Sequence, residues 1–368
     1  MGPEELFDPE EVERGRRYHR PLYLALLAGT ALGLATLAAL AFTRAGDALH
    51  GVVEGLPWAL EAPLFAVLVL LVGTLVRLPL AWWSGHVHER RWELTTQGAG
   101  GWLADRAKGF AVSAVLTGGA LTGLVALARL LPGAWPFAAA VAGAALVLLL
   151  GFLAPVVLEP IFNRFDPLPE GELRTRVLAL AERIGTPVRD VLVADASRRT
   201  RKANAYVSGI GASRRVVLYD TLLERAGAAE VEVVVAHELA HRRERHPAKL
   251  TAGGMAGVAA GVGVLWLLLG DRVADPRTIP HVLLVLGLLQ LAALPPATVL
   301  MRRWERHCDR FALEATRDPE AFERVFRTIT DANVADLDPP RPVRALLMTH
   351  PTVPERIAAA RRFAAAAR

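Results

Sequence analysis

The chain has 368 residues and a formal net charge of +5, and 53% of its residues are hydrophobic, with a mean hydropathy of +0.32. This composition excludes an ordinary soluble domain and favours several membrane-spanning segments. The Lys and Arg residues lie in short groups between apolar runs, which is typical of membrane-protein loops and argues against binding of nucleic acid. The single cysteine, Cys308, excludes an intramolecular disulfide and any cysteine-rich zinc site.

Six apolar runs are long enough to cross a bilayer, which takes about 20 residues. They cover residues 22–42, 64–83, 110–131, 135–158, 250–269 and 281–301. The first run follows a basic stretch and is longer than the apolar region of a cleaved signal peptide, so we expect it to be retained as a span. The sequence therefore predicts a polytopic, mainly α-helical membrane protein.

The distribution of Arg and Lys predicts the orientation of these spans. The N-terminal segment, the loop after the second span, the long segment after residue 158 and the tail after residue 301 are basic. Basic segments stay in the cytoplasm, so we expect both termini and the long middle segment there. The high content of Ala, Arg and Leu with few Lys suggests a bacterial source, which predicts the bacterial cytoplasmic (inner) membrane.

The chain divides into four predicted segments. Residues 1–158 hold about four spans, residues 159–249 have a soluble composition, residues 250–301 form a hairpin of two spans, and residues 302–368 form a charged helical tail broken by Pro339, Pro340 and Pro342. Within the soluble segment, the patterns predict a helix over 173–184 and strands over 188–194, 205–207 and 215–219, with a turn at Gly209 and Gly211. A further helix is predicted over 228–246, ended by Pro247.

The strongest motif is His237-Glu238-Leu239-Ala240-His241, within the last of these helices. Residues four apart share one face of a helix, so both imidazoles can reach one metal ion. Glu238 lies beside them, where a carboxylate can take a proton from an activated water molecule. The motif predicts one Zn²⁺ ion per chain, with His237 and His241 as ligands and Glu238 as the catalytic base.

A catalytic zinc needs a third protein ligand. His246 does not fit the extended motif with a third histidine, because Glu244 and Pro247 occupy the positions that would hold Gly and His. Glu305 is the better candidate, since the two-span hairpin brings it back to the membrane face of the histidines. Asp309, one turn further along, is expected to orient a ligand imidazole.

Several segments resemble the Ste24-type CAAX prenyl protease family of membrane zinc metallopeptidases. They are Phe162-Asn-Arg-Phe-Asp-Pro-Leu168, Asn204-Ala-Tyr-Val-Ser-Gly209, Arg215-Val-Val-Leu-Tyr-Asp-Thr-Leu-Leu223, the His237–His241 helix, Glu305-x-x-x-Asp309-x-x-Ala312, and Thr349-His-Pro351 followed by Arg356-Ile357. The resemblance runs from about Trp92 to the end of the chain. It implies a membrane-embedded zinc endopeptidase whose small α+β catalytic domain is of the gluzincin type, and it implies seven spans where the hydropathy gives six.

The resemblance also implies roles for residues outside the motif. Asn204, Ala205 and Tyr206 would form a strand edge that pairs with an extended substrate, although an ordinary strand edge has the same pattern. His350 would donate a hydrogen bond to the oxyanion, although a histidine at a helix start is the alternative. The expected substrates are peptides or membrane-associated proteins, lipidated or not, at the lipid bilayer.

Two other functions are compatible with the zinc motif. An HtpX-like quality-control protease of misfolded membrane proteins shares it, but such proteins typically carry it earlier in a shorter chain. A non-catalytic membrane scaffold could use zinc structurally. The presence of Glu238 argues against the scaffold, because a structural site needs no base.

Overall fold

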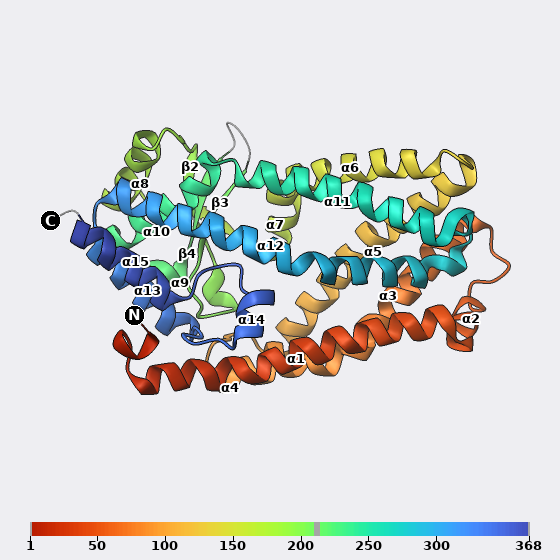
Figure 1. Cartoon of the computed structure of the whole chain (residues 1–368), viewed down its shortest axis with the longest axis horizontal. Coiled ribbons are helices and arrows are strands. Elements are labelled where there is room, and N and C mark those ends of the chain that lie inside the picture. The colour runs from red at the N-terminus through yellow and green to blue at the C-terminus, as the bar shows by residue number, and fades with distance from the viewer. Residues whose placement is uncertain (1, 210–213, 367–368) are drawn as a thin grey trace.

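The computed structural model describes residues 2–209 and 214–366. These residues contain six helices long and apolar enough to cross a membrane, as predicted, and the six run along the long axis of the molecule (Figure 1). Their cores are α1 (Pro9–Phe42), α3 (Trp58–Trp82), α5 (Ala99–Leu130), α6 (Trp135–Leu153), α11 (His246–Leu269) and α12 (Ile279–Thr316). Short helices at their ends are α2 (Arg44–His50), α4 (Glu89–Arg91) and α7 (Glu159–Phe162).

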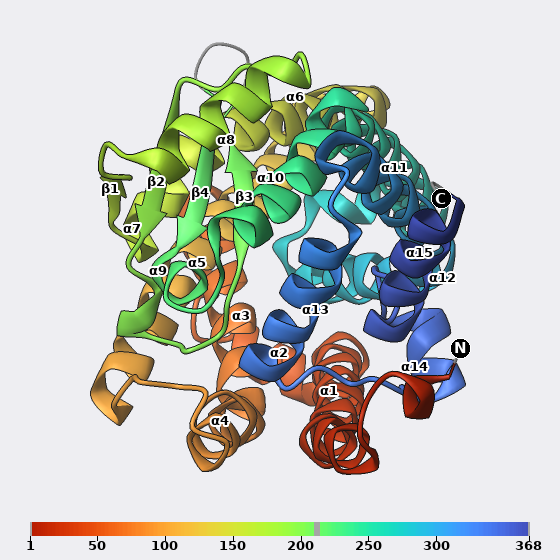
Figure 2. The same cartoon turned by 90° about the vertical axis from the view of Figure 1, so that its left-hand side faces the viewer.

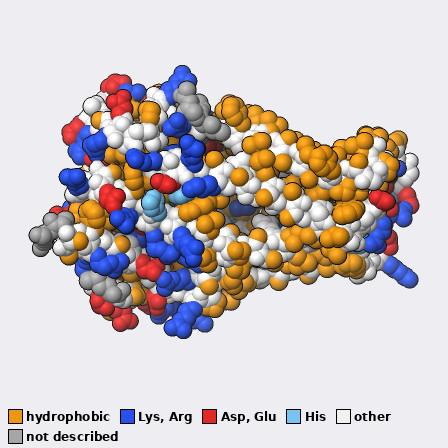
Figure 3. All heavy atoms as spheres, turned by 45° about the horizontal axis from the view of Figure 1, so that its top comes forward, with side chains coloured by type: hydrophobic (Ala, Val, Ile, Leu, Met, Phe, Trp, Pro, Cys, Tyr) orange, Lys and Arg blue, Asp and Glu red, His pale blue; other side chains and the backbone are white. Residues whose placement is uncertain are grey.

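The spanning helices expose large apolar side chains on their outer surface. Phe137 of α6 and Leu267 of α11 are 78% and 77% exposed, which would be costly in water and is ordinary for side chains that face lipid. Figure 3 shows apolar side chains covering the helical part of this face, with charged side chains gathered at its two ends. The pattern supports the prediction of an integral membrane protein.

A small sheet lies at one end of the bundle. The described residues form four strands, β1 (Phe165–Pro167), β2 (Asp190–Ala194), β3 (Ala205–Ser208) and β4 (Arg215–Tyr219), and Figure 2 shows them in the order β1-β2-β4-β3. β2 and β4 are parallel, while β1 and β3 pair antiparallel with their neighbours. Three of these strands were predicted, and β1 was not. The predicted turn begins at Gly209, which has a φ of 82°, and Gly211 lies outside the described residues.

The remaining helices lie at the same end of the molecule, and most of them contribute to one core with the sheet. They are α8 (Glu172–Arg183), α9 (Asp220–Leu223), α10 (Ala228–Arg243), α13 (Pro319–Asn333), α14 (Arg341–Leu346) and α15 (Val353–Ala366). Leu180, Leu218, Leu239, Phe322 and Ile357 come from five different elements and are buried in one cluster. The core therefore joins the middle segment to the C-terminal tail, which are far apart in sequence. Figure 1 shows both labelled termini at this same end of the molecule.

Three predicted boundaries differ from the structure. α10 ends at Arg243, and Arg245 adopts a left-handed conformation with φ of 56°, so the chain turns before Pro247. Pro247 instead lies in the first turn of α11, where the missing N–H is not needed. Likewise, Pro342 lies in the first turn of α14. The predicted segment boundary at residue 301 falls inside α12, which runs on to Thr316 without a break.

Candidate metal centre

The motif helix α10 is buried because its apolar residues face the core. Val231, Val233 and Val235 are each 1% exposed or less, and the turn that follows them presents His237, which is buried, and His241, which is partly buried. α10 packs against α12. This contact places the histidines of one helix against the carboxylates of the other, at the end of the bundle that carries the sheet.

The structure brings His237, His241 and Glu305 together. Nε2 of His237 and Nε2 of His241 lie 3.2 Å apart. Oε2 of Glu305 lies 3.1 Å from Nε2 of His237, and Oε1 lies 3.2 Å from Nε2 of His241. Glu305 is 4% exposed, so this carboxylate is buried against two imidazoles.

A second set of contacts fixes the ring of His237. Its Nδ1 lies 3.0 Å from Oδ1 of Asp309, so the Nδ1–H donates to this carboxylate and Nε2 is the ring nitrogen that faces Glu305. Asp309 in turn accepts hydrogen bonds from the guanidinium of Arg356, one of them from Nε at 2.9 Å. Burial lowers the pKa of His237, but the neighbouring carboxylates of Asp309 and Glu305 outweigh it and raise the pKa to about 9.

Glu238 follows His237 directly and is partly buried. Burial raises the pKa of its carboxyl, since a charge is less stable away from water. A raised pKa brings this carboxylate closer to the range in which it can both accept and return a proton at neutral pH.

His350 reaches the same cluster from the loop before α15. Its Nε2 lies 3.2 Å from Oε2 of Glu305, and its Nδ1 is 2.8 Å from the hydroxyl of Thr349. The side chain of His350 is 54% exposed while that of Glu305 is 6% exposed. His350 therefore lies on the open side of the cluster, between the carboxylate and solvent.

The predicted strand edge lies at β3. In the described residues β3 is an edge strand of the sheet and packs beside α10. The carbonyl of Asn204 accepts from the N–H of Tyr219 at 3.1 Å, and because hydrogen-bonded pairs alternate along antiparallel strands, Ala205 and Val207 direct their backbone groups away from β4. The hydroxyl of Tyr206 donates a hydrogen bond to Oε2 of Glu159 at 3.4 Å.

Two residues of the site were not predicted to act there. Arg356 was noted only as part of a matching segment, yet it holds Asp309. Arg242 donates from its guanidinium to the outward carbonyl of Val207, so it occupies one backbone acceptor of the β3 edge. Arg242 is four residues after Glu238 and therefore shares its helix face. This spacing could have identified Arg242 as a residue of the site from the sequence.

The three donor atoms fit a zinc ion. They all lie within 4.8 Å of one another. The two Nε2 atoms are 3.2 Å apart, and each lies 3.1 or 3.2 Å from one of the two carboxylate oxygens of Glu305. These distances are close to the roughly 3.4 Å between neighbouring donors of a tetrahedral zinc with bonds of about 2.1 Å. Oε2 of Glu305 is buried and makes no hydrogen bond to the described residues. A bound metal ion would supply the partner that this buried carboxylate oxygen lacks.

The fold and the site define a membrane-embedded metallopeptidase. Residues 167–364 match the family described as peptidase family M48, and residues 3–164 match the region described as the CAAX prenyl protease N-terminal, five membrane helices. The chain belongs to peptidase family M48. The described part of its N-terminal region holds four membrane-length helices, where that description has five.

Known proteins support this assignment. The chain is 29% identical to the uncharacterized metalloprotease YhfN of Bacillus subtilis, over 80% of this chain and 71% of that protein. It is 31% identical to CAAX prenyl protease 1 of Saccharomyces cerevisiae, over 50% of this chain but only 40% of that protein. Its fold is similar to the crystal structure of S. mikatae Ste24p, with a TM-score of 0.81 and 22% identity over 96% of this chain and 89% of that one.

These findings confirm the resemblance to the Ste24-type family. The relatives are described as proteases, and the match to them extends through the spans as well as the motif. The HtpX-like and scaffold alternatives are therefore not favoured.

Proposed function

We propose that this protein is a zinc-dependent endopeptidase that cleaves peptides or membrane-associated proteins at the membrane surface. The observation that carries the proposal is the convergence of His237, His241 and Glu305, with contacts of 3.1 to 3.2 Å, at a helix in which Glu238 directly follows His237. A structural zinc site has four protein ligands, whereas a catalytic site has three ligands and an open position with a base nearby.

His237, His241 and Glu305 would hold Zn²⁺, which when bound supplies Lewis-acid activation of water and of the substrate carbonyl. Glu238 takes a proton from the attacking water and delivers it to the leaving amine. Asp309 orients His237 through its Nδ1–H, and Arg356 holds that carboxylate in place.

His350 has a separate role in this proposal. Its exposed ring lies next to Oε2 of Glu305, and its Nδ1 contact with Thr349 orients the ring so that Nε2 faces the cluster. From there Nε2 can donate a hydrogen bond to the oxyanion that develops on the substrate carbonyl.

The β3 edge would bind the substrate as an added strand. The outward carbonyl of Ala205 and the outward N–H of Val207 supply main-chain hydrogen bonds without reading sequence. Asn204 supports this edge, since its side-chain oxygen accepts from the N–H of Ala205 at 2.9 Å. Arg242 limits the pairing at the carbonyl of Val207.

We further propose that the protein resides in a bacterial cytoplasmic membrane and that its site faces the cytoplasm, because the basic segments and both termini lie at the end that carries the site. Its substrates are peptides or proteins, with or without an attached lipid. Several relatives are named CAAX prenyl proteases, and we take a prenyl group to be optional here, since prenylated proteins are not expected in bacteria.

The test is digestion of a peptide library by the purified full chain in detergent, with products identified by mass spectrometry. The proposal predicts internal cleavage that stops when a chelator removes the metal and returns when Zn²⁺ is added back. Cleavage that a chelator does not affect, or no cleavage of any unmodified or prenylated peptide, would contradict it.

A further inference from the structure

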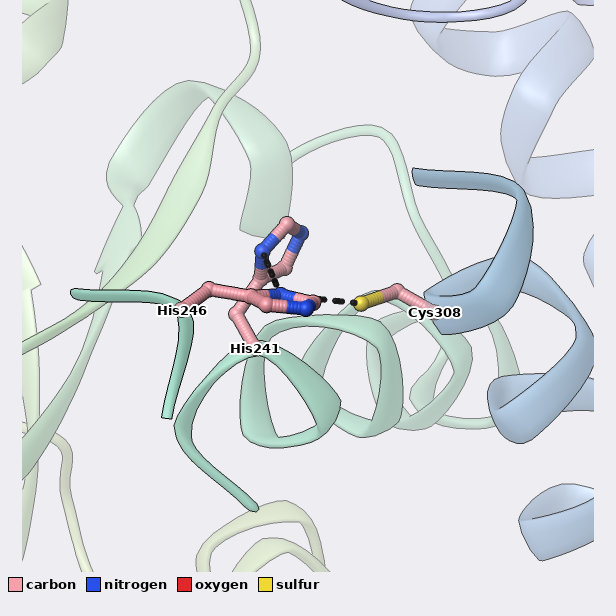
Figure 4. Close-up of side chains that lie close together, drawn as sticks. All are labelled: His241, His246 and Cys308. Atoms are coloured by element: carbon pink, nitrogen blue, oxygen red, sulfur yellow. Dashed lines mark hydrogen bonds between the residues drawn. The ribbon is translucent and has the colours of Figure 1, made fainter. Parts of the chain in front are cut away.

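A second group of metal-binding atoms lies behind His241. Nδ1 of His241 is 3.1 Å from Nδ1 of His246, and Sγ of Cys308 is 3.8 Å from the same nitrogen of His246. Figure 4 shows the two rings and the thiol directed toward one another. These atoms all lie within 4.8 Å of one another, and the group faces the opposite edge of the His241 ring from His237 and Glu305.

The three side chains come from separate elements, and the fold holds them firmly. His241 belongs to α10, His246 begins α11 and Cys308 belongs to α12. His246 is 3% exposed and Cys308 is fully buried. The ring of His246 stacks on Trp304, with ring centres 4.4 Å apart and an angle of 9° between the planes. This stacking fixes the direction of its Nδ1 without using either ring nitrogen.

We propose that His241, His246 and Cys308 form a second metal site, which takes a thiophilic divalent cation such as Cd²⁺ or excess Zn²⁺. A tetrahedral ion with bonds of about 2.1 Å to nitrogen and 2.3 Å to sulfur would set two nitrogens roughly 3.4 Å apart and a nitrogen and a sulfur roughly 3.6 Å apart. The observed 3.1 and 3.8 Å are near these values. One sulfur and two nitrogens suit a softer ion than the two nitrogens and carboxylate of the proposed catalytic site.

The two sites compete because they share His241. Its Nε2 serves the proposed catalytic site and its Nδ1 the second, so filling both requires the imidazole to lose its remaining ring proton. That proton and the thiol proton of Cys308 pass to solvent as the second ion binds. The inference goes beyond the proposed function: an ion held by the second site weakens metal binding at the first, which makes the enzyme sensitive to excess metal.

The test uses the full chain in detergent, stripped of metal and titrated with Cd²⁺, with ultraviolet absorption and metal analysis as readouts. Cys308 is the only cysteine in the sequence, so a thiolate-to-cadmium charge-transfer band reports this residue alone. We expect the band in the wild type and its loss in Cys308→Ala. His246→Phe keeps an aromatic ring against Trp304 but lacks the nitrogen, and it should weaken Cd²⁺ binding in this band at least tenfold.

Two further arms separate this site from the catalytic one. Glu305→Ala removes a ligand of the proposed catalytic site only, so this variant should keep the charge-transfer band. In the wild type, zinc loaded first should raise the Cd²⁺ concentration needed to produce the band. No band in the wild type despite bound Cd²⁺ would overturn the proposal and leave the His241–His246 contact as a hydrogen bond that orients the ring. Loss of the band in Glu305→Ala, or an unchanged band in His246→Phe, would also overturn it. None of these readouts depends on peptide hydrolysis, so they test the second metal site even if the proposed peptidase activity is not found.

Discussion

At the scale of single residues, the proposed metal site depends most on Glu305, because this ligand would come from a different helix than the two histidines. Glu305→Ala leaves two imidazoles, which bind zinc weakly, so we expect zinc and peptide hydrolysis to be lost together. The matched control is Glu314→Ala on the same helix, where the carboxylate is exposed and pairs with Arg310 at 2.8 Å. Metal analysis of purified protein checks the prediction, and full zinc occupancy in Glu305→Ala would exclude this residue as a ligand.

The raised pKa of His237 predicts how zinc binding depends on pH. In the metal-free chain this pKa rises from 6.5 to about 9, so the protonated ring stabilises the fold below pH 6.5 and this contribution is lost as pH rises through 9. Zinc needs the neutral ring, so its apparent affinity should increase with pH across the same window, by up to about tenfold per pH unit for one released proton.

Competition with a chelator of known pH dependence measures this effect. Asp309→Asn supplies the control, since the lost carboxylate lowers the pKa of His237 and should move the window to lower pH while weakening binding about ten- to a hundredfold. An affinity that does not change between pH 7 and 9 would contradict the assigned hydrogen bonds.

The sequence revealed the parts of the site that are close together in the chain. His237, Glu238 and His241 share one helix turn, so their spacing alone predicts a common face. Glu305 required an argument about the hairpin of spans. Arg356 could not be assigned, because it lies 119 positions from His237 and its place depends on how α15 packs against α12. Long-range packing of this kind has no local signal.

At the scale of helices, α1 must approach the tail segment that follows α13 very closely. A Cβ on Gly15 would lie 2.3 Å from the carbonyl oxygen of Ala335, and ion pairs flank this contact, Arg14 with Asp331 at 2.7 Å and Arg16 with Asp338 at 3.1 Å. Glycine is therefore required for the two backbones to meet.

Gly15→Ala should lower the stability of the protein by about 1–3 kcal/mol, as overpacking does. Gly29→Ala is the matched control in the same helix, because no atom lies within 4 Å of its Cβ position and alanine favours helices. Thermal unfolding in detergent compares the two. Equal transition temperatures would show that α1 does not pack on the tail as described.

The elements themselves were largely predictable, since long apolar runs and alternating patterns follow from the sequence. The predicted helix boundaries were wrong at two prolines, because a proline can either end one helix or lie in the first turn of the next. Pro247 and Pro342 were read as helix stops, but each lies in the first turn of the next helix, and local sequence does not separate a stop from a start. The strand β1 has only three residues, so its pairing with β2 leaves no recognisable pattern.

For the whole molecule, the account predicts that the metal centre and the α11–α12 connection lie on opposite sides of the membrane. Cysteines introduced at Ser197, near the sheet, and at Asp271, in the connection, are both exposed positions, and Cys308 is fully buried. In sealed inverted vesicles, an impermeant thiol reagent should label position 197 and miss position 271. The reverse pattern would place the site outside the cytoplasm.

The central claim is that this chain is a metallopeptidase in which Glu238 moves a proton and does not hold the metal. The most direct measurement is zinc content and peptide turnover on the same purified sample of Glu238→Gln. The account predicts the zinc content of the wild type with turnover lowered by about 10²- to 10⁴-fold. Turnover at the wild-type rate, or loss of zinc in parallel with activity, would contradict it.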